Sequence, residues 1–182
     1  NPAVVARDFL SQSEHGTGKE SSILLTTSRE LARKVYREIE MLLAGQKCSS
    51  GMIRAIKEYG LILVLKSLEE CAETANLVAP EHLELAVAKP QKLVPLIRNC
   101  GALFVGHNTC ESVGDYYAGP SHVLPTNGTA RFFSPLSVYH FLKRMSVVEY
   151  DSKALKKAAP DIIAMAEAEG LHYHAEAVRI RV

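Results

Sequence analysis

"SSILLTTSRELARKVYREIEMLLAG", residues 21–45, decides the fold class of this chain. It opens with a short apolar run between serines and threonines, which is typical of a buried strand. Ser28 then stands where a helix N-cap is expected, and Gly45 stands where the helix should stop. The stretch therefore predicts one strand followed by one amphipathic helix. The apolar residues on one face of that helix are Leu31, Val35, Ile39 and Leu42.

The same alternation of strand and helix continues toward the C-terminus. Ser67 and Glu70 have the spacing of a capping box at the start of the second helix, and Pro80 closes it. Alternation at this pace favours an α/β layer with a mainly parallel sheet and flanking helices, an incomplete Rossmann-like layer. The predicted strands are 61–66, 82–88 and 101–106, and the predicted helices are 67–80 and 90–100.

The pattern changes near residue 135. This tail cannot bury its own apolar face unless it packs on the sheet or on another subunit. We therefore expect two parts: an α/β catalytic portion at 1–134 and a C-terminal helical arm at 135–182, packed on or exchanged with a partner subunit. Within the arm we predict a helix at 135–145, a strand at 146–150, one helix or two over 152–171 with Pro160 as the possible break, and a helix or strand at 174–182.

The composition is that of an ordinary globular protein. The 182 residues are 47% hydrophobic and 23% charged, and the net charge of +1 with no basic run gives no reason to expect nucleic acid. No apolar stretch approaches the roughly 20 residues that span a bilayer, and the first residues do not resemble a signal peptide. The four cysteines form no CxxC pair, as in reduced cytoplasmic proteins. We expect a cytoplasmic protein without a membrane partner.

The stretch "ESVGDYYAGPSHVLPT", residues 111–126, is the strongest candidate for function. Its glycines and prolines predict an irregular loop rather than a helix or a long strand. Asp115 and His122 project from it and can reach one ligand. The alternative is a structural loop whose acids, including Glu111, only cap neighbouring elements.

Two shorter clusters carry further chemical groups. In "SQSEH", residues 11–15, Gln12 and His15 share a helix face and offer metal ligands, unless this is a solvated helix end. In "PEHLE", residues 80–84, Glu81 and His82 are a candidate pair for proton transfer, unless they are a surface pair.

A last cluster lies near the C-terminus, in "AEGLHYHAEAV". It carries Glu169, His172 and His174, and two histidines separated by one residue are a common metal arrangement; a solvated polar turn is the alternative. Taken together, the clusters supply one glutamine, several histidines and two or three carboxylates to the loops of an α/β core. That set suits a zinc site with a nearby acid/base group.

Several motifs, in order along essentially the whole chain, resemble the histidinol dehydrogenase family. They are "LSQSEH", "LTTS", "APEHLEL", "ALFVG", "ESVGDYYAGPSHVLPT", "KRMSVVEY" and "AEGLxxHAEAV". The resemblance implies a homodimeric enzyme of histidine biosynthesis that oxidises L-histidinol to L-histidine through the aldehyde, with bound zinc and two NAD-dependent steps.

The resemblance also implies roles for individual residues. The zinc ligands would be Gln12, His15 and Asp115, with His174 donated by the partner subunit. The acid/base pair would be Glu81 and His82, and the substrate contacts His122, Glu169, Asp115 and His82, with Glu169 also reaching over from the partner. His172 has no role in the pattern, and the role of Glu111 stays open between orienting a ligand and capping.

The N-terminal half of the family's chain, with its nucleotide-binding domain, has no counterpart in these residues. We see no GxGxxG loop, so the residues that bind NAD stay unidentified. Three interpretations follow: a piece of a complete dehydrogenase, which the Asn1 start favours, a short relative that binds zinc and ligand without redox activity, or a branch that oxidises a related polar alcohol. His122 and Glu169 speak against the last, since they match imidazole- and amine-binding positions.

Overall fold

The computed structural model describes residues 1–45 and 48–182. They form two compact units, Asn1–His140 and Phe141–Val182, which we describe separately. The division of the chain at residue 134 and the packing of the arm on a partner stay predictions. Among the described residues, none of the helices has both the length and the apolar content needed to cross a membrane.

The first unit is α/β with parallel strand pairing, as predicted. Its strands pair as two small parallel sheets: β1 (Ile23–Thr26) with β2 (Leu61–Val64), and β3 (His82–Leu85) with β4 (Ala102–Val105). In the second sheet His82 lies opposite Ala102, and the Ala102 N–H donates to the Glu81 carbonyl at 2.8 Å. This ladder fixes the backbone of the predicted acid/base pair.

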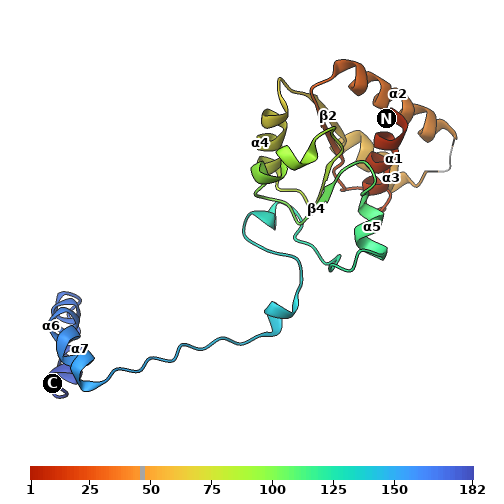
Figure 1. Cartoon of the computed structure of the whole chain (residues 1–182). Helices are drawn as coiled ribbons and strands as arrows, with labels where there is room; N and C mark the ends of the chain where they lie inside the picture. Colours follow the sequence, from red (N-terminus) through yellow and green to blue (C-terminus); the bar gives the residue numbers. More distant parts are fainter. Residues whose placement is uncertain (46–47) are drawn as a thin grey trace. The chain divides into compact units, whose positions relative to one another are not determined.

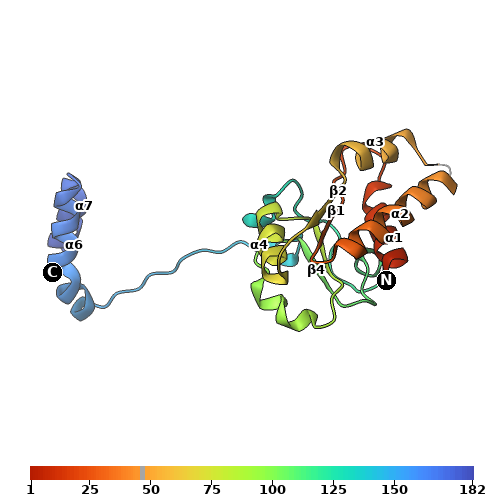
Figure 2. The same cartoon turned by 90° about the horizontal axis from the view of Figure 1, so that it is seen from above.

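The strands of the first unit lie between α4 and the pair α1 and α2, in both views (Figures 1 and 2). The main core forms where α1 and α2 pack on each other, and Leu24 of β1 and Ile62 of β2 pack against it. Ser28 caps α2, as predicted, by accepting the Leu31 N–H at 3.1 Å. The buried core residues are Ala6, Phe9, Val35 and Ile39. The helices are α1 (Pro2–Ser13), α2 (Arg29–Gly45), α3 (Ser50–Tyr59), α4 (Leu68–Val78) and α5 (Glu111–Tyr116).

Prolines explain two differences from the predicted elements. The helix predicted at 90–100 is wrong: only two 3-10 turns form, Pro90–Lys92 and Val94–Leu96. Pro95 would lie inside that helix, where it lacks the backbone donor and clashes with the preceding turn. Pro160, in contrast, does not break its helix. It is exposed, so water can satisfy the carbonyl that the proline leaves without a partner.

Three further differences come from tertiary contacts or from their lack. The prediction that 111–126 contains no helix is wrong, because α5 occupies its start. The helix predicted at 135–145 is reduced to a 3-10 turn, Val138–Phe141, and the strand predicted at 146–150 is irregular chain. Apolar side chains in this last region are exposed, Val147 by 86% and Val148 by 80%, so no core stabilises regular structure there.

The second unit is a pair of helices that pack on each other, α6 (Ser152–Ala168) and α7 (His172–Arg179). Asp151 caps α6 by accepting the Ala154 N–H at 2.7 Å. Gly170, with φ of 74°, takes the left-handed conformation that the tight turn between the helices requires.

A buried amide holds α4 to the segment before β4. Asn76 is 5% exposed; its Nδ2 donates to the Leu96 carbonyl at 2.8 Å, and its Oδ1 accepts the N–H groups of Arg98 at 2.7 Å and Asn99 at 3.1 Å. These bonds replace the helical ladder that Pro95 prevents.

We predict that Asn76→Ala lowers the free energy of unfolding by about 2–3 kcal/mol, because it removes a buried amide and leaves three partly buried backbone groups without their partners. Denaturant unfolding measures this, with Glu73→Ala on the exposed side of α4 as the control. A loss no greater than that of the control would contradict the prediction.

Candidate active site at α1, β3 and α5

Three elements of the first unit each carry two polar residues whose spacing places both side chains on one face of the element. On α1 and α5 the spacing is four residues, which places both side chains on one side of a helix. On β3 it is two residues, which places both on one face of the strand. The pairs are Asp8 and Gln12 on α1, His82 and Glu84 on β3, and Glu111 and Asp115 on α5.

His82 is the point where these elements meet. Its Nδ1 lies 3.1 Å from Gln12 Oε1 and 3.5 Å from Glu111 Oε1, and its ring lies 6.0 Å from the ring of Phe104. Among the described residues, Nε2 of His82 has no hydrogen-bond partner. Every buried side-chain nitrogen or oxygen of these residues does have a partner, so Nε2 is not fully buried. Nε2 therefore reaches solvent and is free to meet a ligand.

Glu84 organises the start of α5. Cys110 occupies the N-cap position without a side-chain bond, and Glu84 Oε1 instead accepts the Glu111 N–H at 3.0 Å. Sequence analysis missed Glu84, although its place two residues after His82 on a predicted strand was the available signal. This bond from β3 also explains why a six-residue helix forms in a segment that was predicted to be irregular.

Glycine allows α5 to lie close to β4. A Cβ on Gly114 would stand 2.7 Å from the ring of Phe104, which is 5% exposed. Gly101 likewise passes the Glu81 carbonyl at a distance that would leave a Cβ 2.6 Å from its oxygen. The two close approaches bring Asp115 and Glu81 into the same neighbourhood.

The site favours the neutral forms of its acid and its base. Burial raises the pKa of Glu81 above its ordinary 4.5; His15 opposes this rise and Asp115 reinforces it. Burial lowers the pKa of His82 below 6.5, and the charge of Asp115 opposes that change. The pKa of Glu111 is raised, first by burial and then by Asp115. A carboxyl and an imidazole that move toward each other in pKa suit proton exchange near neutral pH.

The structure places the other predicted residues of the first unit as follows. His15 is exposed just beyond α1, and its Nδ1 lies 3.1 Å from the Gln12 carbonyl oxygen. His15 and Asp115 both act electrostatically on Glu81 and His82. His122 is exposed on the irregular chain after α5. Within residues 1–45 and 48–182, no three His, Cys, Asp or Glu side chains are gathered as metal ligands, and the zinc assignment stays a prediction.

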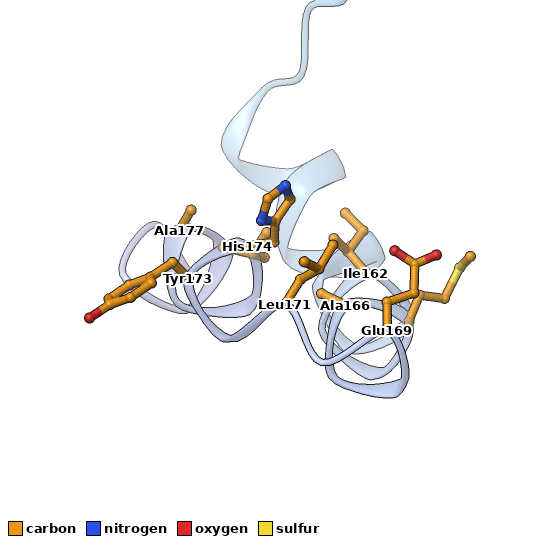
Figure 3. A pocket seen from close by; sticks show the side chains of 9 residues that line it. Ile162, Ala166, Glu169, Leu171, Tyr173, His174 and Ala177 are labelled. Carbon is orange, nitrogen blue, oxygen red and sulfur yellow. The ribbon is translucent and has the colours of Figure 1, made fainter.

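In the second unit, Glu169 and His174 line the same hollow between α6 and α7 (Figure 3). The rest of its lining is mainly apolar and includes Ile162 and Leu171. His172, which was assigned no role, is not among the residues that line it. A carboxylate and an imidazole on one apolar surface can bind a cationic or metal-bound group once that surface is covered.

Comparison with known proteins gives a consistent result. The sequence profile of a family described as "Histidinol dehydrogenase" matches residues 1–182. Curated relatives named histidinol dehydrogenase are 48% identical in Caldanaerobacter subterraneus subsp. tengcongensis and 46% in Aquifex aeolicus, over 181 residues. A crystal structure of histidinol dehydrogenase from Elizabethkingia anophelis superposes with a TM-score of 0.89 at 39% identity. Each comparison covers 100% of this chain but only 41–42% of the other protein.

The partly buried carboxyl of Glu84 predicts a specific pH dependence of stability. Burial, with the charge of Asp8 next, raises the pKa of Glu84 from 4.5 to about 7. Between these pH values the folded state holds more protons than the unfolded state, so the free energy of unfolding decreases as pH rises from 4.5 to about 7. Glu84→Gln, which mimics the protonated acid and keeps an acceptor for the Glu111 N–H, should lose this decrease.

Thermal unfolding at both ends of this pH range tests the prediction. Because Glu84 is only partly buried, solvent screening reduces the gain above pH 7 to about 1 kcal/mol, or roughly 2–4 °C in melting temperature for Glu84→Gln. At pH 4.5 the variant should match the parent. Glu73→Gln on α4 is the matched control. The same pH dependence in Glu84→Gln and the parent would refute the assignment.

Proposed function

The chain belongs to the histidinol dehydrogenase family, and we propose that it carries the substrate-converting part of an NAD-linked oxidation of L-histidinol to L-histidine, a step of histidine biosynthesis. It spans about 42% of the length of the curated relatives it matches. The observation that carries the proposal is the meeting of α1, β3 and α5 at His82. Its imidazole contacts Gln12 and Glu111 through Nδ1 and feels the charge of Asp115, which also acts on Glu81.

The donor set suits a zinc ion. An amide oxygen, an imidazole and a carboxylate are all ligands that zinc accepts, and Gln12, His15 and Asp115 supply one of each. Their common action on His82 supports this assignment: Gln12 lies 3.1 Å from Nδ1, and the other two shift the pKa of its ring. His174, from the second unit of a partner subunit, would be the fourth ligand. The complete site would then need a homodimer with exchanged arms.

The substrate would meet residues of two subunits. His122, Asp115 and His82 from one subunit and Glu169 from the other are the proposed contacts. His122 suits the imidazole of histidinol as a hydrogen-bond partner, and the Glu169 carboxylate suits its ammonium group. The apolar side chains beside Glu169 would exclude water from the bound ligand and strengthen that ion pair.

In the first oxidation His82 acts as the general base. When bound, zinc supplies positive charge that orients the alcohol and NAD supplies the hydride acceptor. His82 takes the hydroxyl proton on its accessible nitrogen Nε2 while the carbon that bears the hydroxyl group transfers a hydride to NAD. The product is the aldehyde. The lowered pKa of His82 keeps the ring unprotonated and ready for this proton near neutral pH.

In the second oxidation Glu81 activates water. Its carboxylate takes a proton from water as the water oxygen adds to the aldehyde carbon. The protonated His82 gives its proton to the aldehyde oxygen, which forms the hydrate and returns His82 to its neutral form. His82 then takes a hydroxyl proton of the hydrate while the second hydride leaves, and the carboxylic acid results. A raised pKa makes Glu81 a stronger base than an ordinary glutamate, which suits this role. Because this step needs the carboxylate form of Glu81, the raised pKa means that the step begins at a higher pH than an ordinary glutamate would allow.

We predict that the zinc-loaded chain forms NADH from L-histidinol and NAD, followed by absorbance. His82→Asn should lower kcat by about 10²–10⁴-fold, because the general base is lost while binding contacts are largely kept. Glu73→Gln is the control and should keep the parent's rate. Zinc and histidinol binding without any NADH would instead favour the second candidate, a protein that binds zinc and ligand without redox activity.

A second prediction concerns the metal alone. Zinc retention after dialysis, measured by elemental analysis, should be lost in the double variant Gln12→Ala, His15→Ala, because two of the proposed ligands are removed. The double variant Glu40→Ala, Glu58→Ala, with both changes on exposed helix positions, is the matched control. Full zinc stoichiometry in the first variant would overturn the ligand assignment.

A further inference from the structure

Glu111 takes no part in the steps above, although it is 7% exposed and its Oε1 lies 3.5 Å from Nδ1 of His82. We propose that Glu111 is a positioning residue. Together with Gln12 it keeps the proton of neutral His82 on Nδ1 and leaves the lone pair of Nε2 free to act as the base. The role of the base rests on the proposed function, whereas the position of the proton does not.

The first argument is that two oxygen atoms face the same ring nitrogen. A neutral imidazole has one N–H donor and one acceptor nitrogen, and the neighbours of each nitrogen decide which is which. Gln12 Oε1 at 3.1 Å and Glu111 Oε1 at 3.5 Å both attract a proton on Nδ1, and both would repel a lone pair there. The contact with Gln12 has the length of a hydrogen bond, whereas Glu111 acts at slightly longer range through its electron-rich oxygen.

The second argument is that Glu111 cannot turn away easily. It is the first residue of α5, and its own N–H is bound to Glu84 Oε1 at 3.0 Å. The close approach of Gly114 to Phe104 holds the same helix against β4. Glu84 stands two residues from His82 on β3, so strand and helix are tied together next to the contact they make.

The alternative, that Glu111 only orients Asp115, is less well supported. The two share a face of α5, and no hydrogen bond joins their side chains in the part of the chain that the structure describes. As a residue that acts through His82, Glu111 should change which nitrogen carries the proton. A residue that only stabilises the fold would leave the protonated nitrogen unchanged.

Long-range ¹H–¹⁵N NMR of the labelled 182-residue chain, free of zinc and NAD, measures the tautomer directly. The pH is held constant above the ordinary imidazole pKa of about 6.5, and His82→Asn assigns the signals. We expect Nδ1 of His82 to be protonated and Nε2 to carry the lone pair. In Glu111→Ala the ratio of this tautomer to the other should fall by about tenfold or more. Glu73→Ala should leave the ratio unchanged.

Several outcomes would overturn the proposal. One is a parent protein with the proton of His82 on Nε2, which needs no variant to detect. Another is a Glu111→Ala ratio equal to that of Glu73→Ala, or a tautomer that changes only in Gln12→Ala. Should Glu111→Ala not fold, the isosteric Glu111→Gln replaces it, and its ratio should fall between the parent's and that of free histidine.

Kinetics add a second readout if the chain turns over. Glu111→Ala should lower kcat by about 10–100-fold with little change in KM for histidinol, since it affects the base and not the substrate contacts. Glu111→Gln should recover part of the rate. Absence of turnover by the parent would count against the proposed function of this chain alone, and the NMR ratio would still decide the role of Glu111.

Discussion

The hydrogen bond from the Glu111 N–H to the Glu84 carboxylate is the contact on which the candidate site depends. It joins β3, which carries His82, to α5, which carries Asp115. Without it the start of α5 would have an unpaired N–H close to a buried glutamate, and a helix of six residues has little stability of its own. This one bond between strand and helix holds Glu111 beside the His82 ring and keeps Asp115, on the same face of α5, close enough to act on that ring electrostatically.

The cost of this arrangement is a concentration of buried carboxyl groups. Glu81, Glu84 and Glu111 all have raised pKa values, and for each the first cause is burial. Groups that lose solvation in this way are ready to exchange protons near neutral pH or to gain from a positive charge placed among them. Burial destabilises the charged forms of these carboxyl groups, and a cation bound by the proposed ligands would stabilise them. Stability and function would therefore be coupled at one place.

The two units also differ in how far they bury their apolar side chains. The first closes a core between α1, α2 and the β1–β2 sheet, where Val35 is fully buried. The second has helices with few buried residues, and Tyr173 and Ile180 are exposed by 84% and 83%. Such a surface is typical of a segment that is covered by another protein surface, and it agrees with the expectation of an arm that packs on a partner.

Local sequence determined a large part of this structure. The apolar runs of β1 to β4, the cap Ser28 and the helical spacing of α2 and α4 predicted the α/β class and parallel pairing, because these signals depend only on near neighbours. The motifs also predicted the family. Glu81 and His82 were a candidate pair in "PEHLE", with a surface pair as the alternative, and only the resemblance to the family gave them acid/base roles, which stay a prediction.

Only the tertiary structure decided the rest. Sequence spacing did not predict α5, since its cap is Glu84 from a distant strand. Pro95 was a local signal against the helix at 90–100, but the bonds to Asn76 on α4 that hold this segment could not be predicted from it. Nor did it show that Nδ1 of His82 faces Gln12, a residue 70 positions away in the chain. Caps, pKa shifts and the choice of tautomer depend on which groups folding brings within a few ångströms, whereas the order of strands and helices is set by the chain itself.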